Sequence, residues 1–281
     1  MLIDPPYLRP RLLQRDNNTH KRNYGHLLIV AGCEQMPGAA VLATGAALQS
    51  GCGLVTLHST ARALQAAVNC YPSAMLSEEY EEHFCTAPAQ LKKYAVVAVG
   101  PGLGRAAGTM NALMDLLTIA ASEKVPMLLD ADALSILSCI PDWPDLLPPQ
   151  CVLTPHMGEL RRLFPHGDDA LRVNLARELC DYAGCTLVLK GYRTKVFTPT
   201  GDSLENTTGG PALAKGGTGD VLTGLIGGLL ARGYAPQDAA ALGVWIHGYA
   251  GDCLAKEKSA EAFSSADLVD SLWKGFKELY G

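Results

Sequence analysis

A glycine-rich turn that ends in an acid is the part of this chain whose residues point most directly to chemistry. Residues 215–220 read Lys-Gly-Gly-Thr-Gly-Asp, and an apolar helical segment, Val221 to Leu230, follows at once. Glycine lets a backbone approach a ligand closely, and free N–H groups at the start of a helix favour phosphate. The turn is therefore predicted to form an anion hole from Gly217, Thr218 and Gly219. Asp220 is a candidate general base beside that phosphate, and an N-cap after a flexible loop is the alternative.

Two other short segments place ionisable side chains directly after apolar runs. Asp130 and Asp132 close one run, where they can orient a substrate or hold Mg²⁺ through water, or can cap a helix over residues 133–137. His156 and Glu159 follow another run, within Thr-Pro-His-Met-Gly-Glu. A lone histidine is more often structural than catalytic, but a position after a buried strand favours a functional role. Both interpretations of His156 therefore stay open.

Backbone and cationic groups that suit a phosphate occur in three further loops. Ala39 lies in Met-Pro-Gly-Ala-Ala, where small residues leave room either for a ligand or for tight packing of a helix on a sheet. Gly104 ends Gly-Pro-Gly-Leu-Gly, which precedes Arg105 and lacks the full G-x-G-x-x-G pattern of a dinucleotide fingerprint. Residues 190–194, Lys-Gly-Tyr-Arg-Thr, provide two cations and a flexible backbone, as nucleotide phosphates require.

The elements that would position these residues alternate between buried strands and helices. Six apolar runs without polar alternation are predicted strands of a parallel sheet: 27–31, 54–57, 95–99, 127–130, 151–154 and 186–190. Helical spacing occurs at residues 38–50, 108–121, 170–182 and 236–256. Residues 195–198 and 203–207 form a predicted antiparallel hairpin at a sheet edge. The alternation is typical of a doubly wound α/β fold, in which ligands bind beyond the carboxyl ends of the strands.

Composition narrows the class of partner. The 281 residues include 48% hydrophobic side chains, which is enough for the core of one large domain over residues 1–281. A net charge of -5 without a basic block argues against nucleic acid and against a membrane surface, so a small molecule is the expected partner. Nine scattered cysteines without metal-ligand spacing indicate reduced thiols. With no apparent secretory signal or membrane span, a cytoplasmic protein is expected.

Seven motifs, in this order, resemble those of the nucleotide-dependent NAD(P)H-hydrate dehydratases. The resemblance covers about residues 20–256 and lies in G-H-L-L-I-V-A-G with M-P-G-A-A (25–40), S-G-C-G-L-V-T (50–56), V-G-P-G-L-G (99–104), L-D-A-D-A-L (129–134), T-P-H-M-G-E (154–159), L-K-G-Y-R-T (189–194) and G-G-T-G-D-V-L-T-G (216–224). It implies a ribokinase-like three-layer α/β fold with a mostly parallel central sheet flanked by helices.

The resemblance also implies an activity. The enzyme would restore NADH or NADPH from its (S)-hydrated form, with ADP or ATP as co-substrate and Mg²⁺ as the metal. Phosphorylation would turn the ring hydroxyl into a phosphate leaving group, and Asp220 would remove the hydroxyl proton. By matching motif, the hydrated dinucleotide would contact Ala39, Gly104, His156 and Asp220. The phosphorylating nucleotide would contact Lys190, Gly191, Tyr192, Arg193, Thr194 and Gly219. Such relatives commonly assemble as tetramers, so a homotetramer is expected.

Two other functions fit parts of the same pattern. A small-molecule kinase of the ribokinase superfamily, such as a vitamin-precursor kinase, would use the Gly-Thr-Gly-Asp site equally well on a stable alcohol. His156 favours the dehydratase, because related thiamin-precursor kinases typically place Asn after the Thr-Pro. A nucleotide-sensing protein without turnover is the third class, and the presence of Asp220 argues against it.

Overall fold

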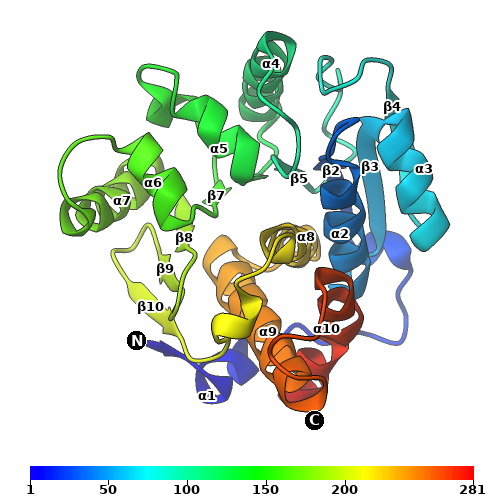
Figure 1. Cartoon of the computed structure of the whole chain (residues 1–281), viewed down its shortest axis with the longest axis vertical. Coiled ribbons are helices and arrows are strands. Elements are labelled where there is room, and N and C mark those ends of the chain that lie inside the picture. Colours follow the sequence, from blue (N-terminus) through cyan, green and yellow to red (C-terminus); the bar gives the residue numbers. More distant parts are fainter.

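The apolar runs form a single ten-stranded sheet in the computed structural model, which describes residues 1–281 (Figure 1). The strands are β1 (Leu2–Ile3), β2 (His26–Val30), β3 (Leu54–Thr60), β4 (Met75–Glu79), β5 (Val96–Val99), β6 (Met127–Leu129), β7 (Val152–Leu153), β8 (Thr186–Leu189), β9 (Lys195–Phe197) and β10 (Ser203–Asn206). Their order in the sheet is β1-β10-β9-β8-β7-β6-β5-β2-β3-β4. Only β9 runs antiparallel, to β8 and to β10, so the predicted hairpin and the mostly parallel sheet are confirmed.

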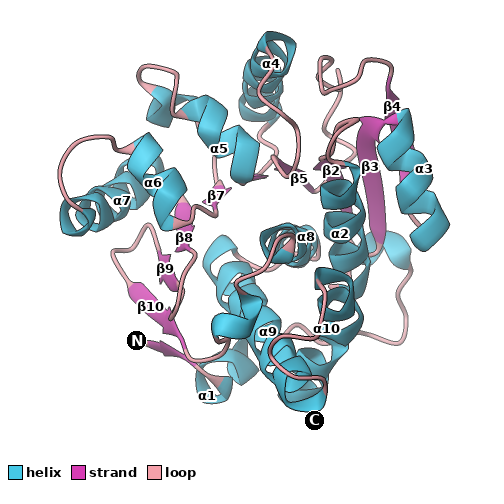
Figure 2. Ribbon diagram, in the orientation of Figure 1, coloured by secondary structure: helices cyan, strands magenta, loops and turns pink.

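Helices cover both faces of this sheet (Figure 2). They are α1 (Pro5–Leu8), α2 (Pro37–Gln49), α3 (Ala61–Cys70), α4 (Ala107–Glu123), α5 (Ala131–Leu137), α6 (Met157–Leu163), α7 (Asp169–Ala183), α8 (Thr218–Ala231), α9 (Pro236–Glu257) and α10 (Ser265–Tyr280). Successive residues of β2 point to opposite faces: Leu27 and Ile29 pack with α2, α3 and α8–α10, whereas Leu28 and Val30 pack with α4–α7. The predicted three-layer arrangement is therefore confirmed.

Two glycines bring α8 against the backbone of α2. A Cβ on Gly224 would lie 2.0 Å from the carbonyl oxygen of Ala43, and one on Gly228 would lie 2.0 Å from Ser50 Oγ. Both separations are far inside van der Waals contact, so only glycine fits at these positions. This close packing fixes α8 beside the centre of the sheet and so fixes where its first turn lies.

Three predictions about the elements need correction. The helix after the glycine turn begins at Thr218 rather than Val221, so Asp220 lies inside its first turn and the N-cap is Gly217. The N-cap alternative for Asp220 is therefore wrong. The β9–β10 hairpin is not at the sheet edge, because β1 adds a parallel strand outside β10. The helix expected over residues 133–137 starts at Ala131. No helix of the structure has the length and apolar character needed to cross a membrane.

Candidate functional site

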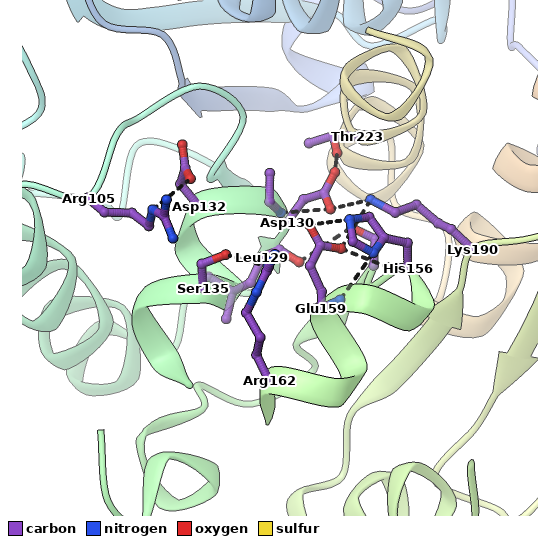
Figure 3. Close-up of polar contacts among 12 residues, drawn as sticks. Arg105, Leu129, Asp130, Asp132, Ser135, His156, Glu159, Arg162, Lys190 and Thr223 are labelled. Carbon is purple, nitrogen blue, oxygen red and sulfur yellow. Dashed lines mark hydrogen bonds and ion pairs between the residues drawn. The ribbon is translucent and has the colours of Figure 1, made fainter. Parts of the chain in front are cut away.

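The chemically distinctive loops meet along one edge of the sheet. Strands β5, β6, β7 and β8 are consecutive neighbours and parallel, so their carboxyl ends lie side by side. Asp130 follows β6, His156 follows β7 and Lys190 follows β8, and an isolated parallel bridge pairs His156 with Lys190. The start of α8 lies next to the same ends, as its residue Thr223 shows in Figure 3. The sheet thus gathers residues that are far apart in the sequence.

The first turn of α8 presents unpaired backbone donors. Gly217 adopts a positive φ of 89° as the N-cap, and no side chain caps the helix. The N–H groups of residues 217–220 donate to no acceptor within the chain. Thr218 Oγ1 is occupied by the carbonyls of Leu213 and Lys215 at 3.0 Å each. Four free N–H groups at the positive end of a 14-residue helix form the kind of site that binds an anion.

Asp220 stands beside these donors without a partner of its own. Its carboxylate makes no hydrogen bond and no ion pair within the chain, although other charges lie close by. The pKa of Asp220 is raised to about 6, chiefly by burial and also by the nearby Asp130 and Asp132, whereas Lys190 opposes the rise. A carboxylate that titrates near neutrality and has a free oxygen is suited to general-base chemistry.

Lys190 is held by a carboxylate rather than free to face solvent. Its ammonium lies 2.6 Å from Asp130 Oδ1 and 3.8 Å from Glu159 Oε2, and its side chain is 17% exposed (Figure 3). Burial by itself would lower the pKa of Lys190, but Asp130 and Glu159 outweigh burial and raise it. The cation is therefore permanent at neutral pH. A Cβ on Gly219 would lie 3.6 Å from this ammonium, so Lys190 reaches the first turn of α8.

The two acids of the Asp-Ala-Asp segment have different roles. Asp130, 1% exposed, is the N-cap of α5 and accepts from Ala131 N at 2.8 Å, while its other oxygen accepts from Thr223 Oγ1 at 2.5 Å. Of the two interpretations, the N-cap is confirmed for Asp130, whose two oxygens are both engaged by protein donors. Asp132 accepts from the backbone N–H of Gly104 at 3.0 Å and lies 3.9 Å from Arg105 Nε.

His156 caps a helix and also exposes its ring. As the N-cap of α6 it accepts from Glu159 N through Nδ1 at 3.1 Å, and Glu159 Oε2 accepts from His156 N at 2.8 Å. This reciprocal capping box fixes the direction of the imidazole. The His156 side chain nevertheless remains 52% exposed, with Nε2 only 3.4 Å from Glu159 Oε1. The structural role is therefore present, and the exposed ring is still free to contact a ligand.

The start of α2, which follows β2, lies next to the glycine loop that follows β5. Ala39 is the third residue of α2, and a Cβ on Gly102 would lie 2.8 Å from the Ala39 methyl group, so this helix start and the loop that contains Gly104 are in contact. A Cβ on Gly104 would meet nothing within 4 Å, and its φ is +77°. The backbone at Gly104 is thus open to a ligand. Asp132 connects this region to Asp220, because it binds Gly104 N and raises the pKa of Asp220.

A cavity of about 550 Å³ is lined in part by Thr218 and Gly219, the two residues before Asp220. Five of its lining residues are predicted nucleotide ligands: Lys190, Gly191, Tyr192, Thr194 and Gly219. Arg193, the sixth, lies outside the lining, with its guanidinium 5.8 Å from the Tyr192 ring centroid. Ala39, Gly104 and His156 do not line the cavity. The predicted nucleotide ligands and the predicted hydrate ligands therefore form two adjoining regions, joined by the bridge between Lys190 and His156, and Asp220 directly follows Gly219 of the cavity lining.

Two residues of the site were not predicted from the sequence. His247 of α9 lines the cavity, and its Nε2 lies 2.9 Å from the carbonyl oxygen of Thr218. Thr223 holds Asp130 from within α8. An imidazole inside an Ala-rich helix was the one available signal for His247, and nothing in the local pattern marks Thr223.

Comparison with known proteins gives a consistent result. A family model described as NAD(P)H-hydrate dehydratase matches residues 27–274. The ADP-dependent (S)-NAD(P)H-hydrate dehydratase of Bacillus subtilis is 34% identical over 96% of this chain and 97% of its own length. The bifunctional NAD(P)H-hydrate repair enzyme of Moorella thermoacetica is 36% identical over 96% of this chain and 53% of its own length, so the chain spans about half of that relative.

Solved structures agree. The crystal structure of the ADP/ATP-dependent NAD(P)H-hydrate dehydratase from Bacillus subtilis, co-crystallised with ATP/Mg²⁺, has a TM-score of 0.86 and 31% identity, and the match covers 99% of this chain and 98% of that chain. A ribokinase-like superfamily protein from Enterococcus faecalis has a TM-score of 0.85 and 28% identity over 98% of this chain and 95% of that chain. The predicted ribokinase-like fold is thereby confirmed.

Proposed function

The chain belongs to the NAD(P)H-hydrate dehydratase family, and we propose that it dehydrates the (S) form of hydrated NADH or NADPH with ADP or ATP as phosphoryl donor. The observation that carries this proposal is the unpaired Asp220 carboxylate, with a pKa raised to about 6, beside four free N–H groups of α8. A proton acceptor and an anion site are the two parts that phosphorylation of an alcohol needs.

The proposed chemistry replaces a poor leaving group with a good one. Asp220 removes the proton of the ring hydroxyl as the hydroxyl oxygen attacks the terminal phosphorus of the nucleotide. The α8 N–H groups and the Lys190 ammonium stabilise the negative charge of the transferring phosphoryl. The ring nitrogen then expels phosphate as the C–O bond breaks, and loss of a neighbouring ring proton restores the double bond. The products are the reduced cofactor, phosphate and the lower nucleotide.

We assign the two adjoining regions to the two substrates. The nucleotide occupies the cavity that is lined by Lys190, Gly191, Tyr192, Thr194 and Gly219, and the hydrated dinucleotide lies against Ala39, Gly104 and His156. Asp220 directly follows Gly219 of the cavity lining, and Asp132, which binds Gly104 N, is near enough to raise its pKa. This supports the assignment, because the base must reach a hydroxyl that faces the phosphoryl donor. The dinucleotide is here a substrate, which accounts for a glycine loop without the dinucleotide fingerprint.

Magnesium is proposed to enter with the nucleotide. The chain has no group of three or more His, Cys, Asp or Glu side chains arranged to hold a metal ion. Mg²⁺ at nucleotide sites keeps several waters and takes its other ligands from phosphates and one or two carboxylates, so such a group is not required. The Bacillus subtilis relative, which was co-crystallised with ATP/Mg²⁺, supports this proposal.

We also propose a cytoplasmic location, one domain and an assembly of four chains. All nine cysteines are free thiols, which suits a reducing cytoplasm. We propose a single domain over residues 1–281 and a homotetramer, the latter from the resemblance alone. Light scattering of the purified protein measures the assembly, and a mass of one chain would contradict the tetramer.

The first experiment is to incubate the protein with hydrated NADH, Mg²⁺ and either ADP or ATP. Recovery of the reduced-nicotinamide absorbance is expected, together with release of phosphate, and the preferred nucleotide is read from the two rates. Asp220→Asn is the matched control, because it removes the base with little change in shape. No recovery with either nucleotide would favour the small-molecule kinase, which would consume nucleotide in the presence of a stable alcohol.

A further inference from the structure

The Lys190 ammonium group interacts electrostatically with three carboxylates in this site. Lys190 contacts Asp130 at 2.6 Å and Glu159 at 3.8 Å, and its charge also lowers the pKa of Asp220. Asp220, however, forms no ion pair with it. Because an ammonium and a nearby carboxylate attract one another strongly in a buried setting, the unpaired state of Asp220 needs a cause. The cause lies in what holds Lys190.

Asp130 is built to hold the cation in place. The Asp130 carboxylate is buried and receives three hydrogen bonds, from Lys190 Nζ, from Ala131 N and from Thr223 Oγ1 (Figure 3). These donors come from the end of β8, the start of α5 and the second turn of α8. Ala131 has a positive φ of 49°, an uncommon backbone conformation for alanine, at the very residue that donates to Asp130. Asp130 is therefore fixed from three directions.

We propose that Asp130 is a positioning residue that keeps the Lys190 ammonium away from Asp220, and so leaves the Asp220 carboxylate free to take the substrate proton. The inference rests on the base role proposed for Asp220. It assigns different roles to the two acids: Asp130 binds the Lys190 ammonium, and Asp220 accepts the substrate proton. Without Asp130, the same ammonium would pair with Asp220 and make it a weaker base.

The other charged groups around Asp220 do not replace Asp130. From α5, Asp132 is bound to Gly104 N. From α6, Glu159 is engaged in the capping box with His156, and at 3.8 Å it lies farther from the Lys190 ammonium than Asp130 does. From α9, burial lowers the pKa of His247 to about 4, so this residue is uncharged at neutral pH. Asp267 of α10 is bound to Lys258 and Ser264, and His26 of β2 is bound to Thr56. Helix α2 and strand β5 contain no ionisable side chain.

The sign of the expected change follows from these charges. Asp130→Asn removes a negative charge near Asp220 and also releases Lys190 to pair with it, and both effects lower the pKa of Asp220. Asp132→Asn is a control two residues away: it removes a negative charge without releasing Lys190, and Asp132 raises the pKa of Asp220 less than Asp130 does. The Asp130 variant should therefore lower the pKa of Asp220 by clearly more than the Asp132 variant does, by about one pH unit or more.

The experiment titrates the Asp220 carboxyl in the ligand-free protein by carbon NMR with labelled aspartate, using Asp220→Asn to assign its signal. The pH at the midpoint of the Asp220 titration is compared among the wild type, Asp130→Asn and Asp132→Asn. In a Lys190→Met background, the effect of Asp130→Asn should become clearly smaller, because only the loss of the Asp130 charge remains and no ammonium is left to be released. Equal shifts for the two single variants, or an unchanged Asp130→Asn shift in the Lys190→Met background, overturn the proposal.

A second substitution at Asp130 covers the case in which Asp130→Asn fails to fold. Asp130→Ser keeps a good N-cap for α5 while removing the charge, and thermal unfolding identifies which variants are folded. The titration needs no substrate, so its outcome is independent of whether hydrated NADH is turned over. Where turnover is measured, the acid limb of the kcat/KM profile of Asp130→Asn should move to lower pH.

Discussion

The imidazole Nε2 of His247 lies 2.9 Å from the carbonyl oxygen of Thr218, so a side chain from the middle of α9 holds the first residue of α8. A carbonyl oxygen only accepts, so Nε2 carries the hydrogen of this bond. Burial lowers the pKa of His247 to about 4, and the ring is neutral under ordinary conditions. The direction of the free N–H groups at the start of α8 thus depends on a residue outside the glycine turn.

Replacing His247 should loosen the anion site. His247→Leu leaves the Thr218 carbonyl without its donor, and we expect the free energy of unfolding to fall by about 1–3 kcal/mol. The KM for the nucleotide should rise more than kcat falls, because the N–H groups that bind phosphate lose their fixed direction. His247→Gln is the control, since its amide can donate to the same carbonyl. Denaturant unfolding and nucleotide titration check both effects, and an unchanged nucleotide affinity in the Leu variant would contradict the argument.

His247 also predicts how stability depends on pH. Its pKa is lowered from 6.5 to about 4 in the folded protein, so between these values the unfolded chain binds more protons than the folded one. Stability is therefore lost as pH falls from about 6.5 to about 4, by at most about 3 kcal/mol from this residue. His247→Gln should lose less stability over that range than the wild type. Unfolding curves at several pH values test this, and identical slopes for both proteins would exclude the contribution.

Much of the sheet could be predicted from the sequence because its central strands are buried on both faces. Residues 27–30 are completely buried, and such runs leave little doubt about a parallel strand. Strand β4 was not predicted, since Met75 and Leu76 are each 45% exposed and its pattern resembles a loop. The start of α8 was placed three residues late because Gly-Thr-Gly is unfavourable within a helix. Packing of Gly224 and Gly228 on α2 overrides that local preference.

The site could be predicted only as a set of neighbouring loops. Strand order brings the loops after β5 to β8 together, and that much follows from the alternation of strands and helices. The partners within the site do not follow: Asp130 binds Lys190, 60 residues away, and Thr223, 93 residues away. For this reason the sequence left Asp130 open between a cap and a metal site. It also made Lys190 a phosphate ligand without showing that a carboxylate already holds it.

Asp220→Asn should separate binding from turnover. The amide has nearly the same shape as the carboxylate but cannot accept the hydroxyl proton, so turnover should fall by about 10²–10⁴-fold while nucleotide binding is kept. In the wild type, kcat/KM should decline as pH falls through about 6, because protonated Asp220 is not a base. Steady-state rates and nucleotide titration measure both. Near-normal turnover in the variant would remove Asp220 from the base role.

His156 allows its two roles to be distinguished by two substitutions. His156→Ala removes both the cap of α6 and the exposed ring, so stability should fall by about 1 kcal/mol and hydrate affinity should fall as well. His156→Asn keeps a good N-cap and removes only the ring, so it should weaken hydrate binding at nearly wild-type stability. Hydrate KM, nucleotide KM and thermal unfolding are compared for the two variants. Equal weakening of hydrate and nucleotide binding would contradict the position proposed for His156.

Two glycines of the anion hole should respond differently to the same substitution. Gly217 has a φ of +89°, and a Cβ there would lie 2.5 Å from Leu42 Cδ1, so Gly217→Ala should destabilise the fold by about 1–3 kcal/mol. Gly219 lies in the first turn of α8 with ordinary space around it, since its Cβ would be 3.6 Å from Lys190 Nζ. Gly219→Ala should leave stability unchanged or slightly higher, because alanine favours helix. Its methyl group would nevertheless enter the cavity beside the Lys190 ammonium, and the nucleotide KM should rise.

Thermal unfolding and nucleotide titration of Gly217→Ala and Gly219→Ala test this contrast. Wild-type nucleotide affinity in a stable Gly219→Ala protein would mean that the phosphate does not approach this backbone.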